Sequence, residues 1–239
     1  MDTIKFDKKQ VKMVAHRGVS GIEMENTNAA FVAAGNRSYF GIETDVHVTK
    51  DKQIVVVHDD NLKRVAGVDL VVEESNLADI LAVALYDKAE GQYRTDLHTP
   101  VLADYIKICK KYGKTAVLEL KNRMEPDDIA AIAEQIRQLD YLDGVIFISF
   151  AWENLIDLRK IVPGQKAQFL TTRSDMELVQ ELTEQKLDLD IYYKSLTKQM
   201  LDACHENGLE VNCWTVDCDK EAEKLAVWGV DYITSNILE

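Results

Sequence analysis

Two carboxylates, Glu43 and Asp45, stand two residues apart in the apolar run G-I-E-T-D-V-H-V at residues 41–48. Residues two apart on a β-strand point to the same face, so both side chains should project to one side of a sheet. Burying two acids together is unfavourable unless a proton or a cation neutralises them. The pair therefore predicts a site that holds a cation or a proton.

Other groups that can do chemistry follow the ends of further apolar runs on both sides of this pair. They are His16, Arg17, His58, Glu119 and Lys121. An imidazole titrates near neutral pH and can move protons, and the planar fork of arginine matches two phosphate oxygens. Three carboxylates offer only oxygen ligands, which suit a hard cation such as Mg²⁺ or Ca²⁺ better than zinc. The set suits a site that holds a divalent metal and a phosphate while protons move.

The residues by themselves leave a structural explanation open. Glu43, Asp45 and Glu119 could instead form internal salt bridges with Arg17 and Lys121, and a single histidine at the end of a strand is more often structural. Two further polar residues have two interpretations each. His47 shares a face with Asp45 and could be a fourth ligand, although a supporting hydrogen bond is preferred. Glu25 could contact the metal or substrate, or organise the start of a helix.

Composition indicates a globular protein with one large core. The chain has 239 residues, of which 46% are hydrophobic and 29% charged, a length that suits one α/β barrel or two small domains. The net charge of −13 would repel nucleic acid and an anionic membrane surface. We therefore expect no nucleic-acid partner, and a small anionic substrate would have to be attracted by a local cation, namely a metal, Arg17 or Lys121.

Residues 1–10 lack the apolar core of a signal peptide, and no run approaches the ~18 apolar residues of a membrane span. We therefore expect no stable membrane insertion. The four cysteines, Cys109, Cys204, Cys213 and Cys218, form no C-x-x-C and no zinc-type spacing. A reduced, cytoplasmic protein is the simplest interpretation, with a redox pair of Cys213 and Cys218 as the alternative.

Apolar runs alternate with amphipathic segments, which predicts eight strands separated by helices. The expected strands cover residues 11–15, 41–48, 116–120, 145–149, 167–170, 189–193, 210–215 and 230–234. Ser174 with Glu177 predicts a capping box, and Thr197 predicts another helix start. The pattern predicts one domain over residues 1–239, a parallel (β/α)8 TIM barrel with its active groups at the carboxyl ends of strands. An open doubly wound sheet is the alternative, but H-R-G-V-S-G is a poor nucleotide-binding loop.

Two segments depart from this alternation. Residues 59–100 are too long for one loop and predict an insertion, with a β-arm at 54–57, a short helix near 77–85 and a lid role beside His58. Four residues follow Ser235, so the eighth outer helix should be missing. Either the segment around Ile4 and Phe6 or a second subunit should cover the barrel there, and we favour a homodimer.

Seven short motifs, in this order, resemble the glycerophosphodiester phosphodiesterase family. They are His16-Arg17-Gly18, Glu25-Asn26-Thr27, Glu43-Thr44-Asp45, Thr49-Lys50-Asp51, His58-Asp59, Glu119-Leu120-Lys121 and Trp214-Thr215. The resemblance runs from about residue 14 to residue 235. Met24 stands where the family has proline, Lys52 where it has a turn glycine, and the ending T-S-N-I-L-E lacks the common Asp and Pro. These departures remove no chemical group, but Met24 leaves the shape of the first loop open.

The resemblance implies metal-dependent hydrolysis of glycerophosphodiesters to sn-glycerol 3-phosphate and an alcohol. In this scheme Glu43, Asp45 and Glu119 would bind Mg²⁺ or Ca²⁺, His16 and His58 would be acid and base, and Arg17 and Lys121 would bind phosphate. Phe150 and Trp214 would form an apolar wall for the glycerol, or simply pack the barrel rim. His98 and His205 are expected at the surface.

Three other functions fit parts of the pattern. A lysophospholipase D or phospholipase C-like enzyme would apply the same chemistry to a lipid, although residues 86–98 are mostly polar for an apolar lid. A metal-dependent barrel aldolase or isomerase would need a proton abstractor near a carbonyl and no phosphate fork. A non-catalytic phosphate-ester binder would not need the pair of histidines.

Overall fold

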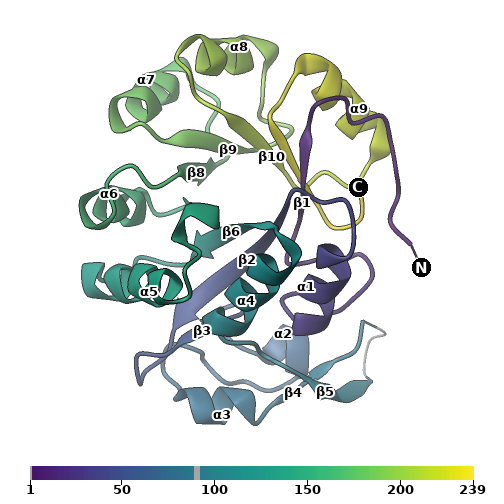
Figure 1. Ribbon diagram of the computed structural model, residues 1–239, viewed down its shortest axis with the longest axis vertical. Helices are drawn as coiled ribbons and strands as arrows, with labels where there is room; N and C mark the ends of the chain where they lie inside the picture. Colours follow the sequence, from purple (N-terminus) through teal and green to yellow (C-terminus); the bar gives the residue numbers. More distant parts are fainter. Residues whose placement is uncertain (1, 89–91) are drawn as a thin grey trace.

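Eight parallel strands close into a barrel in the computed structural model, which describes residues 2–88 and 92–239 (Figure 1). In chain order they are β1 (Lys12–Ala15), β2 (Gly41–Val48), β6 (Thr115–Leu120), β7 (Val145–Ser149), β8 (Ala167–Thr171), β9 (Asp188–Tyr192), β10 (Val211–Trp214) and β11 (Tyr232–Ser235). The sheet order is β1-β11-β10-β9-β8-β7-β6-β2, and pairing of β1 with β2 closes it. The predicted TIM barrel is confirmed.

Helices cover the outside of the barrel (Figure 1). They are α1 (Asn28–Gly35), α4 (Leu102–Tyr112), α5 (Pro126–Gln138), α6 (Trp152–Ile161), α7 (Met176–Gln185), α8 (Lys198–Glu206) and α9 (Asp219–Trp228), with a 3-10 turn, η1, at Leu142–Gly144. Buried residues recur at helical spacing, as with Ile129, Ile132 and Ile136 on α5. A smaller cluster fills the barrel interior: Val14, Val117, Ile146, Ile148, Leu170 and Tyr232.

The starts of two helices test the predicted caps. The hydroxyl of Thr197 accepts a hydrogen bond from the Met200 amide, as predicted. The prediction for Ser174 was wrong, because Asp175 is the N-cap of α7 and its carboxylate accepts from the Leu178 amide at 3.0 Å. Aspartate caps as well as serine, so the sequence alone did not separate the neighbours.

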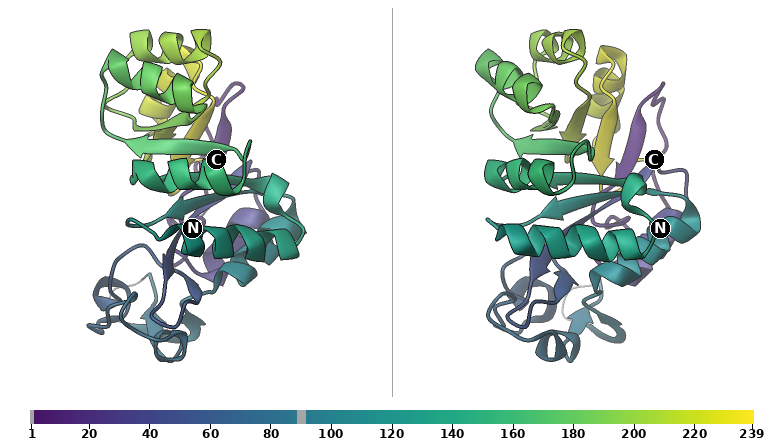
Figure 2. Two further views of the ribbon diagram at one scale, coloured as in Figure 1. Left: turned by 90° about the vertical axis from the view of Figure 1, so that its left-hand side faces the viewer. Right: turned by 60° about the vertical axis from the view of Figure 1, so that its left-hand side comes forward.

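The segment between β2 and α4 forms the predicted insertion-like excursion beside the barrel (Figure 2). It contains β3 (Ile54–Val56), antiparallel to β2, then α2 (Lys63–Ala66), α3 (Leu77–Leu81) and a hairpin of β4 (Ala84–Tyr86) with β5 (Tyr93–His98). The helix expected to reach residue 85 ends at Leu81, because residues 84–86 pair with β5 instead. The excursion has its own apolar cluster, which includes Leu62, Ile80 and Leu97.

No helix follows β11 within residues 236–239, and the N-terminal segment lies against this tail instead. Ile4 bridges Leu238, its amide donates to the Ile237 carbonyl at 3.0 Å, and its carbonyl accepts from the Glu239 amide at 2.9 Å. Phe6 packs against the main core. The first of the two expected covers is therefore present.

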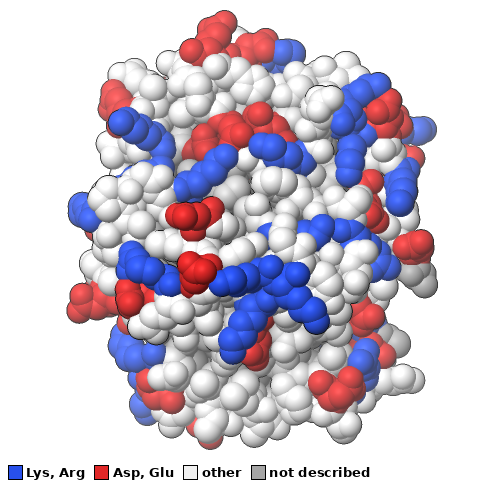
Figure 3. Space-filling view, in the orientation of Figure 1, with Lys and Arg blue, Asp and Glu red and all other residues white. Residues whose placement is uncertain are grey.

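Charged side chains of both signs share the face shown in Figure 3, where basic groups gather across the middle over α4. That helix carries Lys107, Lys110 and Lys111. His98 and His205 are exposed, as predicted. Within the described part of the chain, every helix is too short or too polar to cross a lipid bilayer.

Candidate active site

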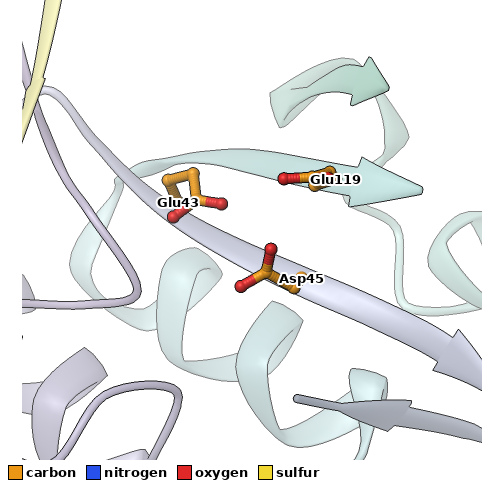
Figure 4. Close-up of side chains that lie close together, drawn as sticks. All are labelled: Glu43, Asp45 and Glu119. Carbon is orange, nitrogen blue, oxygen red and sulfur yellow. The ribbon is translucent and has the colours of Figure 1, made fainter. Parts of the chain in front are cut away.

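Three carboxylates meet on two neighbouring strands of the barrel, Glu119 near the end of its strand and Glu43 and Asp45 midway along theirs (Figure 4). Glu43 and Asp45 lie on β2, and Glu119 lies on the neighbouring β6, directly opposite Asp45 in the strand register. One oxygen from each of the three lies within 4.8 Å of the others. The three residues are 3%, 1% and 7% exposed, respectively. The predicted carboxylate cluster therefore forms, and it is buried.

The pKa values of the three carboxyl groups show that the nearby basic side chains do not fully compensate the negative charge of the carboxylate cluster. Burial and the nearby Asp45 raise the pKa of Glu43 well above its usual range and the pKa of Glu119 to about 8. Burial opposes ionisation of Asp45 as well, but Arg17 and Lys121 outweigh it and lower the pKa of Asp45. The Oδ1 atom of Asp45 is buried without a hydrogen-bond partner. An all-oxygen set with an unpartnered oxygen fits a hard divalent cation such as Mg²⁺ or Ca²⁺.

Two basic side chains reach the carboxylate cluster. Lys121 Nζ lies 2.9 Å from a Glu119 oxygen and 3.6 Å from Asp45 Oδ1. Arg17 Nε lies 3.6 Å from Asp45 Oδ2, and its Nη1 donates to Glu25 at 2.8 Å. The internal salt bridges considered as an alternative are therefore present. They place both cations where a phosphate next to the cluster would meet them.

The first loop, after β1, holds Arg17 in place through its backbone. The Arg17 amide donates to Glu43 Oε2 at 2.8 Å, and the chain turns at Arg17 and Gly18 with positive φ angles of 52° and 74°. A Cβ at Gly18 would lie 2.7 Å from Ala30, so only glycine fits. Met24, the departure from the family pattern, packs against the apolar cluster of the excursion.

Asn26 is a site residue to which the sequence analysis assigned no role. Its side-chain amide donates to Asp45 Oδ2 at 2.8 Å, and its oxygen accepts from the Thr44 hydroxyl at 2.7 Å. Asn26 is 4% exposed and also has a positive φ of 53°. It orients the carboxylate of Asp45, and its place in the motif Glu25-Asn26-Thr27 was the available signal.

His16 is held by a chain of hydrogen bonds from the C-terminal tail. Its Nδ1 lies 2.7 Å from the Asn236 side-chain oxygen, and the Asn236 amide nitrogen donates to Asp217 at 2.6 Å. A carboxylate such as Asp217 only accepts hydrogen bonds, so the Asn236 amide nitrogen must face Asp217 and the Asn236 oxygen must face His16. That oxygen accepts a hydrogen bond, so His16 Nδ1 carries a proton. Burial and the charge of Arg17 lower the pKa of His16 to about 4. The free lone pair is then on Nε2, which lies 4.0 Å from Glu43.

His58 is held by a second chain, which reaches into the excursion. Its Nδ1 lies 2.7 Å from Asp59 Oδ1, and burial, with Arg17, lowers its pKa. Arg64 on α2 donates to Asp59 at 2.7 Å and to Glu25 at 2.7 and 2.8 Å. Arg64 thus ties the partner of His58 to the partner of Arg17. Arg64 could not be recognised from the sequence, because it lies outside the seven motifs.

His47 is fully buried next to the backbone of His58 and takes no part in the carboxylate cluster. Its Nδ1 lies 2.9 Å from Glu73, and its Nε2 lies 3.3 Å from the His58 carbonyl oxygen. These contacts fit the preferred interpretation, a supporting hydrogen bond, rather than a fourth ligand. Glu25 likewise binds Arg17 and Arg64 and so organises the loop.

A cavity of about 90 Å³ joins most of the predicted site residues. One side consists of His16, Arg17, Glu43, His58 and Glu119. The other side includes Phe150 and Trp214, whose rings meet edge to face with centroids 5.5 Å apart. A larger groove of about 580 Å³, between β3 and the start of α5, contains no predicted site residue. The small cavity is therefore the candidate active site.

Comparison with known proteins agrees with this geometry. The model of the glycerophosphoryl diester phosphodiesterase family matches residues 16–238. A glycerophosphodiester phosphodiesterase of Caldanaerobacter subterraneus subsp. tengcongensis is 27% identical, over 94% of this chain and 93% of the relative. The structure of an Oleispira antarctica phosphodiesterase in complex with the product sn-glycerol-3-phosphate has a TM-score of 0.88 and 25% identity, over 98% of this chain and 96% of that one. The chain belongs to the glycerophosphoryl diester phosphodiesterase family and is therefore a phosphoric diester hydrolase.

Proposed function

We propose that the protein hydrolyses glycerophosphodiesters to sn-glycerol 3-phosphate and an alcohol with the help of a divalent metal. The observation that carries the proposal is the cluster of Glu43, Asp45 and Glu119, with oxygens within 4.8 Å of one another, in a cavity shared with two histidines. The Oleispira antarctica relative contains sn-glycerol-3-phosphate, which supports the same product here.

The cofactor in this proposal is Mg²⁺ or Ca²⁺, bound by Glu43, Asp45 and Glu119. When bound, it would neutralise a phosphoryl oxygen and orient the nucleophile. Arg17 and Lys121 would share the negative charge that develops on the phosphate in the transition state. Both already lie within 3.6 Å of Asp45, so little movement is needed.

His16 and His58 act as base and acid in this scheme. His16 has its Nδ1 proton fixed by Asn236 and a pKa lowered to about 4, so its Nε2 stays free to take a proton from the nucleophile. His58 has the carboxylate of Asp59 on its Nδ1, which favours the charged form once the substrate phosphate is bound. His58 then protonates the leaving alkoxide. The nucleophile is water, or it is the glycerol 2-hydroxyl, in which case a water molecule must then open the resulting cyclic phosphate to give glycerol 3-phosphate.

The size and lining of the cavity favour a small substrate. At about 90 Å³ it is well below the ~300–1,000 Å³ of pockets that enclose drug-sized ligands. The edge-to-face pair of Phe150 and Trp214 would then contact the carbon chain of the glycerol. A human lysophospholipase D is 46% identical over 63 residues, 26% of this chain, which makes a lysophospholipid the second candidate substrate.

Four further features complete the proposal. Residues 1–239 act as one domain, in which the insertion at about 59–100 supports His58 through Arg64. The protein works in the cytoplasm, in lipid and glycerol metabolism. It forms a homodimer. It binds no nucleic acid, in keeping with its net charge of −13.

The test is release of glycerol 3-phosphate from a panel of glycerophosphodiesters and lysophospholipids, with Mg²⁺, Ca²⁺ or EDTA. We expect turnover of the small diesters with a divalent cation and none with EDTA. Full activity of thoroughly chelated protein would refute the metal dependence. Faster cleavage of lysophospholipids than of every small diester would favour the second candidate.

A further inference from the structure

An acidic residue without an assigned role, Asp190, lines the active-site cavity from the far wall. It lies on β9, four strands from β2 in either direction around the closed barrel, so it faces the carboxylate cluster from the opposite side. Its side chain is 1% exposed, and its Oδ1 atom has no hydrogen-bond partner. A buried polar atom that lines a ligand cavity and lacks a partner requires an explanation.

Among the described residues, Asp190 has a polar neighbour but no charged partner that would compensate its burial. The neighbouring strand β10 contributes Asn212, whose amide donates to the Thr234 hydroxyl of the next strand, β11, at 3.0 Å. The Trp214 indole donates to the backbone carbonyl of Asp190, not to its side chain. Among the described residues, no lysine or arginine lies at ion-pair distance from the carboxyl group. Burial raises the pKa of Asp190 to about 8, and a hydrogen bond with the Asn212 side chain lowers it by a smaller amount.

A carboxyl group in this state can both donate and accept a hydrogen bond. Its neutral form offers one O–H donor and keeps acceptor capacity, which suits an alcohol, itself both donor and acceptor. A phosphate is disfavoured beside Asp190, because in the part of the chain that the structure describes no lysine or arginine lies near its carboxyl group to balance the negative charge of the ligand. The chemistry of the far wall is therefore that of a hydroxyl site, while Arg17 and Lys121 lie on the phosphate side.

We propose that Asp190 binds the terminal hydroxyl of the glycerol unit and makes the enzyme selective for glycerol esters. This inference rests on the proposed function. The phosphate would lie against the carboxylate cluster, and the glycerol would extend across the barrel along the wall of Phe150 and Trp214. Its terminal hydroxyl, the part of glycerol farthest from phosphorus, then reaches Asp190. The leaving alcohol is directed toward the open side of the cavity.

The test compares two diesters that share a leaving alcohol, one of glycerol and one of 2-hydroxypropyl phosphate, which lacks the terminal hydroxyl. Wild-type enzyme should prefer the glycerol diester by roughly 10- to 100-fold in kcat/KM, the effect expected of one hydrogen bond to such a group. In Asp190→Leu the preference should fall to about 1–3-fold, mainly through a loss of kcat/KM on the glycerol diester. Asp190→Asn, which has no O–H to donate, should have a preference between those of wild type and Asp190→Leu. It also provides the measurement if the leucine variant does not fold.

Asp202→Asn, a half-exposed residue on α8, is the matched control and should keep the wild-type preference. An unchanged preference in both Asp190 variants would overturn the proposal. Stabilisation of the protein by sn-glycerol 3-phosphate and by 2-hydroxypropyl phosphate, measured as shifts in Tm, gives a readout that needs no turnover. If wild type cleaves neither diester, the proposed function fails, but a Tm preference lost in the Asp190 variants would still support hydroxyl binding.

Discussion

Replacing Asp190 with asparagine should stabilise the protein, and the gain should grow with pH. The pKa of Asp190 is raised to about 8 in the fold, against about 3.9 for an unfolded aspartate. Between these values the folded state keeps a proton that the unfolded state releases. The free energy of unfolding therefore falls as pH rises from about 4 to about 8, and the fold is penalised most above that window.

The size of the effect follows from the same two pKa values. At pH 7 the solution is about 3 pH units above the unfolded pKa, while the folded state still holds the proton. At about 1.4 kcal/mol per pH unit, this lowers the free energy of unfolding by about 4 kcal/mol. Asparagine has nearly the same shape and no charge to suppress, so Asp190→Asn should recover about 2–4 kcal/mol at pH 7. For a chain of 239 residues this raises Tm by roughly 5–10 °C.

The assay is denaturant unfolding of wild type, Asp190→Asn and the control Asp202→Asn at pH 4.5, 7 and 8.5. The difference between Asp190→Asn and wild type should be at most about 1 kcal/mol at pH 4.5 and largest at pH 8.5, while the control stays near wild type throughout. A gain that is the same at every pH, or a loss at pH 8.5, would refute the reasoning. A variant that is more stable yet less selective would show that the buried acid is retained for binding.

Three other predictions test the remaining parts of the site. Glu43→Gln or Asp45→Asn should weaken divalent-metal binding at least tenfold in calorimetry and reduce turnover accordingly, whereas undiminished affinity would exclude these ligands. His16→Ala and His58→Ala should each lower kcat by about 10²–10⁴-fold with folding and metal binding kept. A nitrophenyl leaving group should rescue the His58 variant, and equal losses on both substrates would reduce the two histidines to positioning roles. Removal of residues 2–8 should speed proteolysis and lower Tm if they cover the barrel, and sedimentation of the intact chain as a monomer would contradict the homodimer.

Much of the site could be predicted because strand periodicity and barrel topology act on short, local patterns. The run at residues 41–48 is β2 with the expected bounds, so Glu43 and Asp45 share a face as a period of two requires. Glu119 then had to lie nearby, because a parallel barrel brings the carboxyl ends of adjacent strands to one edge. In the structure it lies directly opposite Asp45.

Asp190 shows where this reasoning stops. The run L-D-L-D-I-Y at residues 187–192 alternates, so its two acids share a face, but alternation does not say which face points into a barrel. Most alternating strands turn their polar residues to solvent, and the opposite holds here because helices cover the outside of the barrel. Arg64 was hidden for another reason: its contacts with Glu25 and Asp59 depend on how the excursion folds back, which no local pattern encodes.

The charges at the active end of the barrel suggest the order in which the site is assembled. Arg17 and Lys121 are engaged with the carboxylate cluster in this structure, and protons are favoured on Glu43 and Glu119. While the two basic side chains neutralise carboxylates, they are only partly available to a phosphate. A divalent cation bound by these carboxylates, as proposed, would displace those protons and compete with Arg17 and Lys121 for the carboxylate oxygens. Arg17 and Lys121 would then be freer to meet a phosphate, so the proposed function would have the metal bind before the substrate.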